Sequence, residues 1–246
     1  MPEIVIVTGG AGGLGRVYSL ALAEAGYGVI VADLADPAGV VAEIEAAGGA
    51  ALGVNVDVSD LGSAEAMAGA TLERFGRIDA LVNNAAYYTA IVKKPFEELT
   101  VEEWDLCFAV NVRGAWLCTR AVAPAMKEQR SGKIINVSST TVPTGLDGLL
   151  HYVTSKAAIV GMTRSLAREL GEWNIAVNTV TPDYIAFDRD YDNRQPALAG
   201  ILSQQRCFKR EVTPEDMVGT ILHLVGHGSD FVTGQNLHVN GGRFFP

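Results

Sequence analysis

A glycine-rich stretch near the start of the chain most constrains its fold. The β-branched residues Ile4 to Val7 are typical of a strand buried on both faces, and they lead into Thr8-Gly9-Gly10-Ala11-Gly12-Gly13-Leu14-Gly15. An apolar stripe at helical spacing follows and ends at Gly26. A strand, a tight glycine turn and a helix N-terminus together form a cradle for the pyrophosphate of a dinucleotide. The alternative is an ordinary turn between a strand and a helix, where glycine is common.

A carboxylate ends the second predicted strand. Residues 29–33 read Val-Ile-Val-Ala-Asp. Asp33 thus falls about 20 residues past the glycine turn, where an acidic side chain accepts hydrogen bonds from the adenosine ribose. Because a carboxylate repels a 2′-phosphate, and no Lys or Arg occurs in the turn before Gly13, the sequence predicts NAD rather than NADP. The alternative is a solvent-exposed Asp at a strand end.

Strand-like and helix-like segments alternate along the rest of the chain. Predicted strands cover 51–56, 78–83, 133–139, 176–180 and 236–239, and predicted helices cover 36–48, 60–75, a long segment from Thr100, 151–171 and a segment from Thr213. This alternation is typical of an α/β fold with a doubly wound parallel sheet. Residues 182–212 show no clear periodicity and are predicted to form a substrate lid. No linker or repeat interrupts the sequence, so we expect a single Rossmann-like domain over 1–246.

Charge and apolar patterning argue against several classes of partner. The net charge of −9 disfavours nucleic acid and anionic membranes, which bind basic surfaces. No apolar run reaches the roughly 18 residues of a membrane span, and the N-terminus lacks the basic region of a signal peptide. Cys107, Cys118 and Cys207 are scattered, so we expect reduced thiols in a cytoplasmic protein. The histidines show no metal-site spacing, and no metal is expected.

Tyr152 and Lys156 are the candidate catalytic pair. Their spacing places both side chains on one face of a helix. A free phenol has a pKa near ~10, and a neighbouring ammonium group favours the phenolate, so such a tyrosine can take a proton from an alcohol or give one to a carbonyl. Ser139 ends a predicted strand, where its hydroxyl can hold a substrate oxygen. Asn111 lies inside a predicted helix, where asparagine is unfavourable. Each of these residues alone also has an ordinary structural explanation.

Together, the motifs resemble the short-chain dehydrogenase/reductase family over essentially the whole chain. They follow the family's order and spacing: Thr8-Gly9-x-x-x-Gly13-x-Gly15, Asp57-Val58, Asn83-Asn84-Ala85, Asn111, Ser139, Tyr152-x-x-x-Lys156 and Pro182. The resemblance implies that Tyr152 is the acid/base and that Lys156 lowers its pKa and binds the nicotinamide ribose. It also implies that Ser139 holds the substrate oxygen and that Asn111 supports a proton-relaying water.

The resemblance further implies a set of cofactor contacts. These are Gly9, Gly13, Leu14 and Gly15 at the pyrophosphate, Asp33 at the adenine ribose, Asp57 and Val58 at the adenine, Asn84 and Ala85 on the ribose side, Ile185 at the carboxamide, and Tyr152 and Lys156, which bind the cofactor as well as acting in catalysis. Three residues depart from the family pattern. Ala86 replaces a glycine, with little expected effect. Asp183 also replaces a glycine, so any positive-φ requirement there is unmet or relaxed. Phe187 replaces a threonine that contacts the cofactor, so that contact is expected to be lost.

These residues lead us to expect an NAD-dependent alcohol dehydrogenase, acting on a small secondary alcohol or its ketone and assembled as a homotetramer like most family members. An aryl or cyclic alcohol is expected because aromatic and apolar residues gather in the predicted lid and loops: Tyr87, Tyr88, Val142, Tyr184, Phe187 and Tyr191. A 3-ketoacyl-thioester reductase is the alternative, disfavoured by Asp33 and by the net charge of −9. A sugar-nucleotide epimerase would need a further substrate domain. A non-catalytic NAD-binding protein would not need the intact Ser139, Tyr152 and Lys156.

Overall fold

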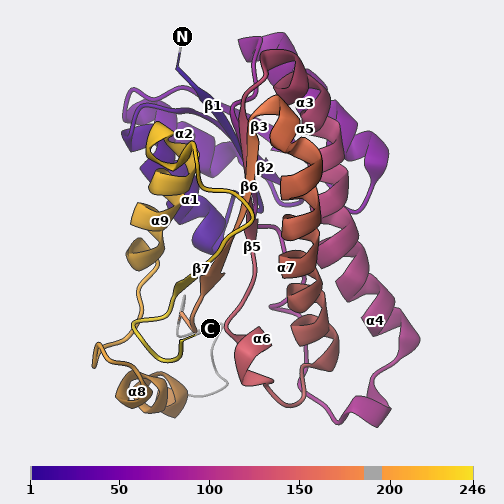
Figure 1. The fold of residues 1–246 in the computed structure, drawn as a ribbon, viewed down its shortest axis with the longest axis vertical. Helices are drawn as coiled ribbons and strands as arrows, with labels where there is room; N and C mark the ends of the chain where they lie inside the picture. The colour runs from indigo at the N-terminus through magenta and orange to yellow at the C-terminus, as the bar shows by residue number, and fades with distance from the viewer. Residues whose placement is uncertain (1, 186–195, 246) are drawn as a thin grey trace.

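The computed structural model describes residues 2–185 and 196–245 and is built on one parallel sheet (Figure 1). Within these residues, seven strands lie in the order β3-β2-β1-β4-β5-β6-β7. They are β1 Ile4–Thr8, β2 Gly28–Asp33, β3 Ala51–Asn55, β4 Ala80–Asn83, β5 Gly132–Val137, β6 Ile175–Pro182 and β7 Asn236–Val239. The strand order reverses between β1 and β4, and open parallel sheets bind ligands at such a switch point, beyond the carboxyl ends of the strands.

Helices cover both faces of the sheet, as Figure 1 shows. They are α1 Gly13–Glu24, α2 Ala38–Ala46, α3 Leu61–Phe75, α4 Val101–Phe108, α5 Ala115–Gln129, α6 Thr141–Thr144, α7 Leu150–Leu170, α8 Pro196–Gln205 and α9 Glu215–Val225, with short 3-10 turns at Phe96–Glu98, Gly171–Trp173 and His227–Ser229. Helices α1, α2 and α9 pack on one face, and α3, α5 and α7 pack on the other. The predicted doubly wound α/β fold is confirmed.

Strand β1 shows why the sheet needs two covering layers. Successive side chains of a strand point to opposite faces. Ile4 and Ile6 pack in the cluster with α3 and α5, whereas Val5 and Val7 pack in the cluster with α1 and α9. All four side chains are buried, as the unbroken β-branched run predicted.

The long helix predicted from Thr100 has a change of winding in its middle. Its start is a capping box in which the Thr100 hydroxyl accepts from the Glu103 N–H and the Glu103 carboxylate accepts from the Thr100 N–H. After α4, the segment Ala109–Gly114 is a π-helix, and α5 follows. Wider π turns of this kind occur mostly as short insertions in α-helices and frequently at functional sites.

The prediction that 182–212 is aperiodic was wrong for part of that segment. It contains the ten-residue helix α8. The apolar pattern of α8 is weak because Gly200 interrupts it and Ile201 is 56% exposed, while Leu202 is buried. Among the described residues, no helix combines the length and the apolar character needed to cross a bilayer.

Candidate active site

The glycine turn between β1 and α1 has the geometry of a phosphate cradle. Gly9 and Gly13 have φ values of +65° and +50°, a region that side chains rarely adopt. A Cβ on Gly15 would lie 1.9 Å from the Gly9 carbonyl oxygen, so the turn closes only with glycine there. By contrast, a Cβ on Gly12 or Gly13 would meet nothing within 4 Å. The exposed backbone at these two residues, next to the N-terminus of α1, fits a pyrophosphate.

Replacing Gly15 by alanine is therefore expected to lower the free energy of unfolding by about 3 kcal/mol or more, because the overlap involves backbone that cannot move aside. Urea denaturation of the variant measures this loss. The matched control is Gly69→Ala in α3, where an added Cβ meets nothing within 4 Å. That control is expected to gain roughly 0.5–1 kcal/mol, since alanine is the better helix former. Equal stability of the two variants would contradict this description of the turn.

The loop after β4 is fastened to the glycine turn. The Asn84 side-chain amide donates to the carbonyl oxygens of Thr8 (3.0 Å) and Gly9 (3.2 Å), and the Ala85 N–H donates to the Thr8 hydroxyl (3.1 Å). Leu14, in the first turn of α1, packs partly buried against the core. The amide group of Asn84 thus braces the turn, and its predicted position on the ribose side remains a prediction.

Asp33 lies at the end of β2 with its carboxylate turned toward the glycine turn. One oxygen accepts from the Ala11 N–H at 2.8 Å and the other from the Ala35 N–H at 2.9 Å. No ion pair to Asp33 occurs within the described ranges 2–185 and 196–245, and the neighbouring Leu34 is 70% exposed. A negative charge without a neighbouring cation fits ribose hydroxyls and disfavours a 2′-phosphate.

Asp57 and Val58 both have structural roles after β3. The Asp57 carboxylate accepts from the Ser59 N–H (2.8 Å) and hydroxyl (2.7 Å), which makes it the cap of a turn. Val58 is buried, and its side chain packs against Gly114. A Cβ added to Gly114 would lie only 2.8 Å from a methyl carbon of Val58. Their predicted contacts with the adenine remain predictions.

The structure brings Ser139, Tyr152 and Lys156 together beyond the carboxyl end of β5. The Ser139 hydroxyl lies close enough to the Tyr152 phenol to lower its pKa, and it accepts from the Thr141 N–H (3.2 Å) and hydroxyl (3.0 Å). The Lys156 ammonium donates to the Val137 carbonyl oxygen at 2.9 Å and lies 5.8 Å from the centre of the Tyr152 ring. Both residues of the predicted pair are on α7 and buried.

Burial shifts the pKa of both members of the pair. It raises the pKa of the Tyr152 phenol, the nearby Tyr88 raises it further, and the hydrogen bond with Ser139 lowers it. Burial also lowers the pKa of Lys156 to about 8. The ammonium of Lys156 is bonded to the Val137 carbonyl. Its predicted lowering of the Tyr152 pKa remains a prediction.

Asn111 lies within the π-helix and joins three segments. The oxygen of its side-chain amide accepts from the Tyr87 N–H at 2.6 Å, and the nitrogen of that amide donates to the Ser155 hydroxyl at 3.0 Å. Ser155 in turn donates to the Tyr152 carbonyl oxygen at 2.7 Å. Asn111 thus connects the loop after β4 with the helix that carries Tyr152. The predicted water relay remains a prediction.

Tyr88 contacts the catalytic candidate directly. Its ring centre lies 4.8 Å from that of Tyr152, with the two planes inclined by 43°. Tyr88 is 42% exposed, so part of its ring remains accessible beside Tyr152. The sequence analysis placed Tyr88 in an aromatic pocket. It could not predict the contact with Tyr152, because 64 residues separate the two in the sequence.

The chain beyond β6 leads toward the predicted lid. Ile185, the predicted carboxamide contact, forms an isolated parallel bridge with Val212 and is partly buried. Phe187 and Tyr191, which the sequence analysis assigned to the lid, lie outside the described residues.

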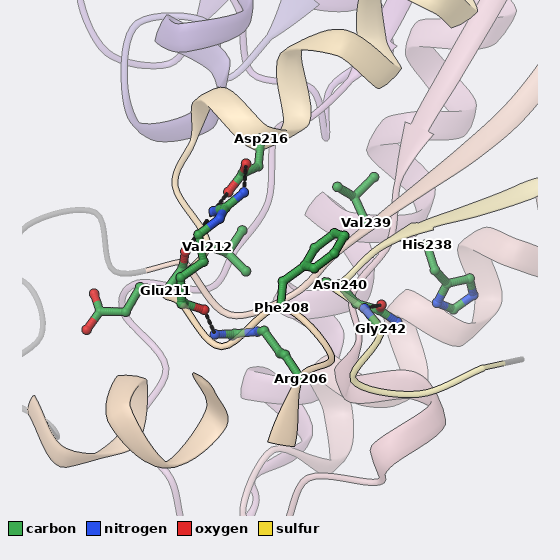
Figure 2. Close-up of a pocket in the computed structure, with 11 residues that line it drawn as sticks. Arg206, Phe208, Glu211, Val212, Asp216, His238, Val239, Asn240 and Gly242 are labelled. Atoms are coloured by element: carbon green, nitrogen blue, oxygen red, sulfur yellow. Dashed lines mark hydrogen bonds and ion pairs between the residues drawn. The ribbon is translucent and has the colours of Figure 1, made fainter. Parts of the chain in front are cut away.

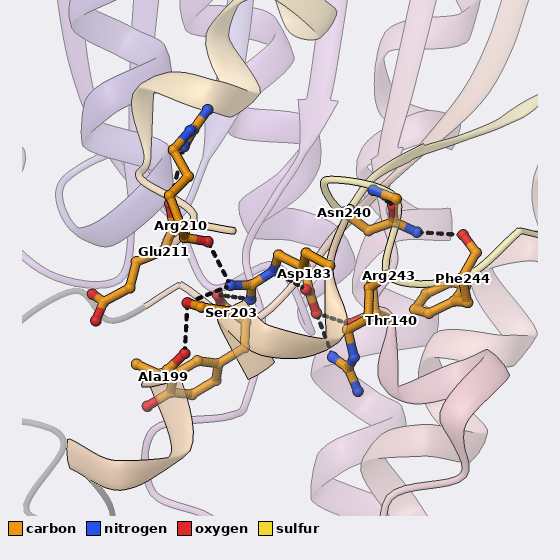
Figure 3. Close-up of polar contacts among 12 residues, drawn as sticks. Thr140, Asp183, Ala199, Ser203, Arg210, Glu211, Asn240, Arg243 and Phe244 are labelled. Atoms are coloured by element: carbon orange, nitrogen blue, oxygen red, sulfur yellow. Dashed lines mark hydrogen bonds and ion pairs between the residues drawn. The ribbon is translucent and has the colours of Figure 1, made fainter. Parts of the chain in front are cut away.

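The departure at Asp183 has a clear structural consequence. Its backbone has no positive φ, so the glycine requirement is relaxed. The buried carboxylate accepts from Arg206 Nε (2.8 Å), an Arg243 guanidinium nitrogen (2.6 Å) and the Thr140 hydroxyl (3.0 Å) (Figure 3). Sequence reasoning missed this cluster. The arginines lie 23 and 60 residues from Asp183, and only the unusual acid after Pro182 was visible.

A separate cavity of about 380 Å³ lies between the segment 206–212 and the end of β7 (Figure 2). Phe208, Val239 and His238 contribute to its lining, as does the Arg210–Asp216 ion pair. None of the predicted site residues lines it. The cavity is therefore separate from the candidate cluster of Ser139, Tyr152 and Lys156.

Comparison with known proteins agrees with this geometry. A family model described as enoyl-(acyl carrier protein) reductase matches residues 9–243. The chain belongs to the short-chain dehydrogenase/reductase family. It is 36% identical over 247 residues to a 3-oxoacyl-[acyl-carrier-protein] reductase of Staphylococcus aureus, covering 99% of both chains. It is 37% identical over 243 residues to a (2S)-[(R)-hydroxy(phenyl)methyl]succinyl-CoA dehydrogenase subunit of Thauera aromatica, covering 98% of this chain and 96% of the relative.

A solved structure shows the same fold over almost the full length. A candidate gluconate dehydrogenase from Agrobacterium tumefaciens superposes with a TM-score of 0.90 at 31% identity, covering 98% of this chain and 95% of the other. The chain is thus an oxidoreductase of this family, with the family's site for a nicotinamide cofactor. The Staphylococcus aureus and Thauera aromatica relatives are both named for acyl thioesters. The comparisons therefore favour the thioester reductase that the sequence analysis placed second.

Proposed function

We propose that this protein interconverts a 3-oxoacyl thioester and the corresponding 3-hydroxyacyl thioester, with NAD as the hydride carrier. The observation that carries the reaction type is the buried cluster of Ser139, Tyr152 and Lys156 at the carboxyl edge of the sheet. The named relatives support the thioester as substrate class.

Ser139, Tyr152 and Lys156 have different roles in the proposed reaction. A nicotinamide cofactor, when bound at the glycine turn and Asp33, would supply or accept the hydride. The Ser139 hydroxyl lies close enough to the Tyr152 phenol to affect its pKa, so one substrate oxygen can contact both hydroxyls. Tyr152 gives a proton to that oxygen in reduction and takes it back in oxidation. The Val137 carbonyl holds the Lys156 ammonium beside the Tyr152 ring, where its charge stabilises a phenolate once the proton has left.

The phenol of Tyr152 is in the form that can donate a proton. Burial raises its pKa and so favours the neutral hydroxyl. Reduction of a 3-oxoacyl substrate would place negative charge on the carbonyl oxygen, which the neutral phenol can protonate.

The geometry of Asp33 predicts the cofactor preference. With a 3-oxoacyl thioester as substrate, kcat/KM is expected to be higher with NADH than with NADPH, because the carboxylate repels the 2′-phosphate. Asp33→Asn removes the charge and is expected to reduce that preference by about 10-fold, equivalent to about 1.4 kcal/mol. Steady-state assays at the nicotinamide absorbance band measure both ratios. A wild-type preference for NADPH would contradict the assignment.

The substrate class is tested by comparing acetoacetyl-CoA with acetophenone, a simple aryl ketone. We expect a kcat/KM at least about 10-fold higher with the thioester. The second candidate function, dehydrogenation of an aryl secondary alcohol, is favoured by one observation: the partly exposed Tyr88 ring beside Tyr152, on which an aryl group could stack. A higher kcat/KM with acetophenone would select this second function.

We also infer that the protein forms a homo-oligomer. Apolar side chains are exposed along α4 and α5, with Val101 at 70%, Leu106 at 46% and Trp116 at 45%. Apolar surface of this kind marks interaction sites. Light scattering after gel filtration tests the inference, and a monomer at micromolar concentration would refute it.

A further inference from the structure

The ion cluster around Asp183 contains one carboxylate and two guanidinium groups. The Asp183 side chain is 0% exposed, that of Arg206 is 2% exposed and that of Arg243 is 15% exposed. Within residues 2–185 and 196–245, neither arginine has an ion pair to any other carboxylate. The cluster therefore has a surplus positive charge in a largely buried place, where charges are normally paired.

The two arginines differ in how many of their donors are used. Arg206 donates to Asp183 through Nε, to Ser203 and the Arg210 carbonyl through one terminal nitrogen, and to the Tyr184 carbonyl through the other. Arg243 donates one hydrogen bond, to Asp183, among the residues that the structure describes. A guanidinium has several N–H groups in a fixed fork. The surplus charge and the unused donors thus belong to Arg243.

The position of Arg243 connects it to the proposed active site. Arg243 and the Thr140 hydroxyl donate to the same oxygen of Asp183, at 2.6 and 3.0 Å. Thr140 directly follows Ser139, the residue placed at the substrate oxygen. Figure 3 shows Arg243 beside Thr140 and Asp183. Its guanidinium is therefore close to the loop on which the reacting oxygen would rest.

We propose that Arg243 binds an anionic group of the substrate, and that the preferred acyl chain has a free carboxylate in addition to the reacting oxygen. This inference rests on the proposed function. A carboxylate can accept two parallel N–H bonds from a guanidinium, and Asp183 holds that guanidinium in place. The substrate class is then the half-thioester of a dicarboxylic 3-oxo or 3-hydroxy acid.

A matched pair of thioesters tests this inference. 3-Oxoadipyl-CoA and 3-oxohexanoyl-CoA have acyl chains of equal length, and only the first ends in a carboxylate. Since both contain the phosphates of CoA, the comparison isolates the acyl carboxylate as the source of the anion. We expect wild-type kcat/KM to be about 10-fold or more higher for 3-oxoadipyl-CoA. Arg243→Gln should bring the ratio of the two values close to one, mainly through KM, and Arg243→Lys should retain part of it.

Binding measurements keep the test independent of turnover. Calorimetric titration with the unreactive adipyl-CoA and hexanoyl-CoA should show the same preference in the wild type and its loss in Arg243→Gln. Arg74→Gln removes the same charge from the exposed face of α3, away from the inferred subunit contact, and should preserve the ratio. Because Arg243→Gln leaves Asp183 paired with the buried Arg206, the variant is expected to fold, and thermal melting checks this.

The possible results separate the two proposals. Equal binding of adipyl-CoA and hexanoyl-CoA by the wild type would overturn the role of Arg243, even if both oxo thioesters are reduced. A preference that survives in Arg243→Gln would overturn it as well. No reduction of either oxo thioester, combined with an Arg243-dependent preference for adipyl-CoA, would overturn the proposed function and support the anion site.

Discussion

Tyr152→Phe is expected to lower kcat for acetoacetyl-CoA reduction by about 10²–10⁴-fold, the usual contribution of a positioned acid or base. The change removes the hydroxyl beside Ser139 and keeps the ring that packs against Tyr88. NADH binding, measured by fluorescence titration, should remain detectable, because the glycine turn and Asp33 are unchanged. The loss should therefore appear in kcat and not in cofactor affinity.

Tyr18→Phe is the matched control for that experiment. Tyr18 in α1 is fully buried, and among the described residues its hydroxyl has no hydrogen-bond partner. Removing an unpaired buried hydroxyl costs little or is stabilising, so activity and stability should be close to wild type. If Tyr152→Phe kept activity within about 10-fold of the control, below the usual contribution of an acid/base, another group would have to supply the proton.

Asp183→Asn is expected to lower the free energy of unfolding by about 3–5 kcal/mol. The variant removes the charge of the carboxylate that Arg206 and Arg243 share, and it leaves two guanidinium groups without an ion-pair partner in a largely buried place. Asparagine has nearly the same size, so lost packing does not explain such a change. Urea denaturation followed by circular dichroism measures the loss.

The control for this second prediction is an exposed ion pair. Arg16 and Glu43 join α1 to α2, and their side chains are 43% and 47% exposed. Glu43→Gln is expected to change the free energy of unfolding by no more than about 1 kcal/mol, because solvent already screens that pair. If Asp183→Asn lowered the free energy of unfolding as little as Glu43→Gln, the buried cluster would contribute no more to stability than a surface ion pair.

The site could be predicted where its residues are close in sequence. The strand, glycine turn and helix at the N-terminus follow one another within a short segment, and Gly15 is required by contact with the nearby Gly9. Likewise, Tyr152 and Lys156 share α7, so helix periodicity alone brings them to one face. Local rules of this kind need no knowledge of how distant segments pack.

Other features could not be predicted because distant segments create them. The π-helix around Asn111 provides contacts to Tyr87 and Ser155, which lie on different elements. Helix α8 has only a weak apolar pattern, so its periodicity did not reveal it. The pKa of Tyr152 depends on how completely the assembled fold excludes water, and burial raises it, which the spacing of Tyr152 and Lys156 in the sequence does not reveal.

The sequence by itself determined the alternation of strands and helices outside 182–212, the glycine turn, the acid at the end of β2 and the placement of Tyr152 and Lys156 on one helix, because each depends on residues within one or two neighbouring elements. Only the tertiary structure decided that Asp183 would be buried between Arg206 and Arg243. The end of β6, the segment after α8 and the C-terminal segment meet there, and their spacing in sequence does not reveal that contact. Removing one charge of this cluster is costly because its partners are buried, and burial is a property of the folded chain as a whole.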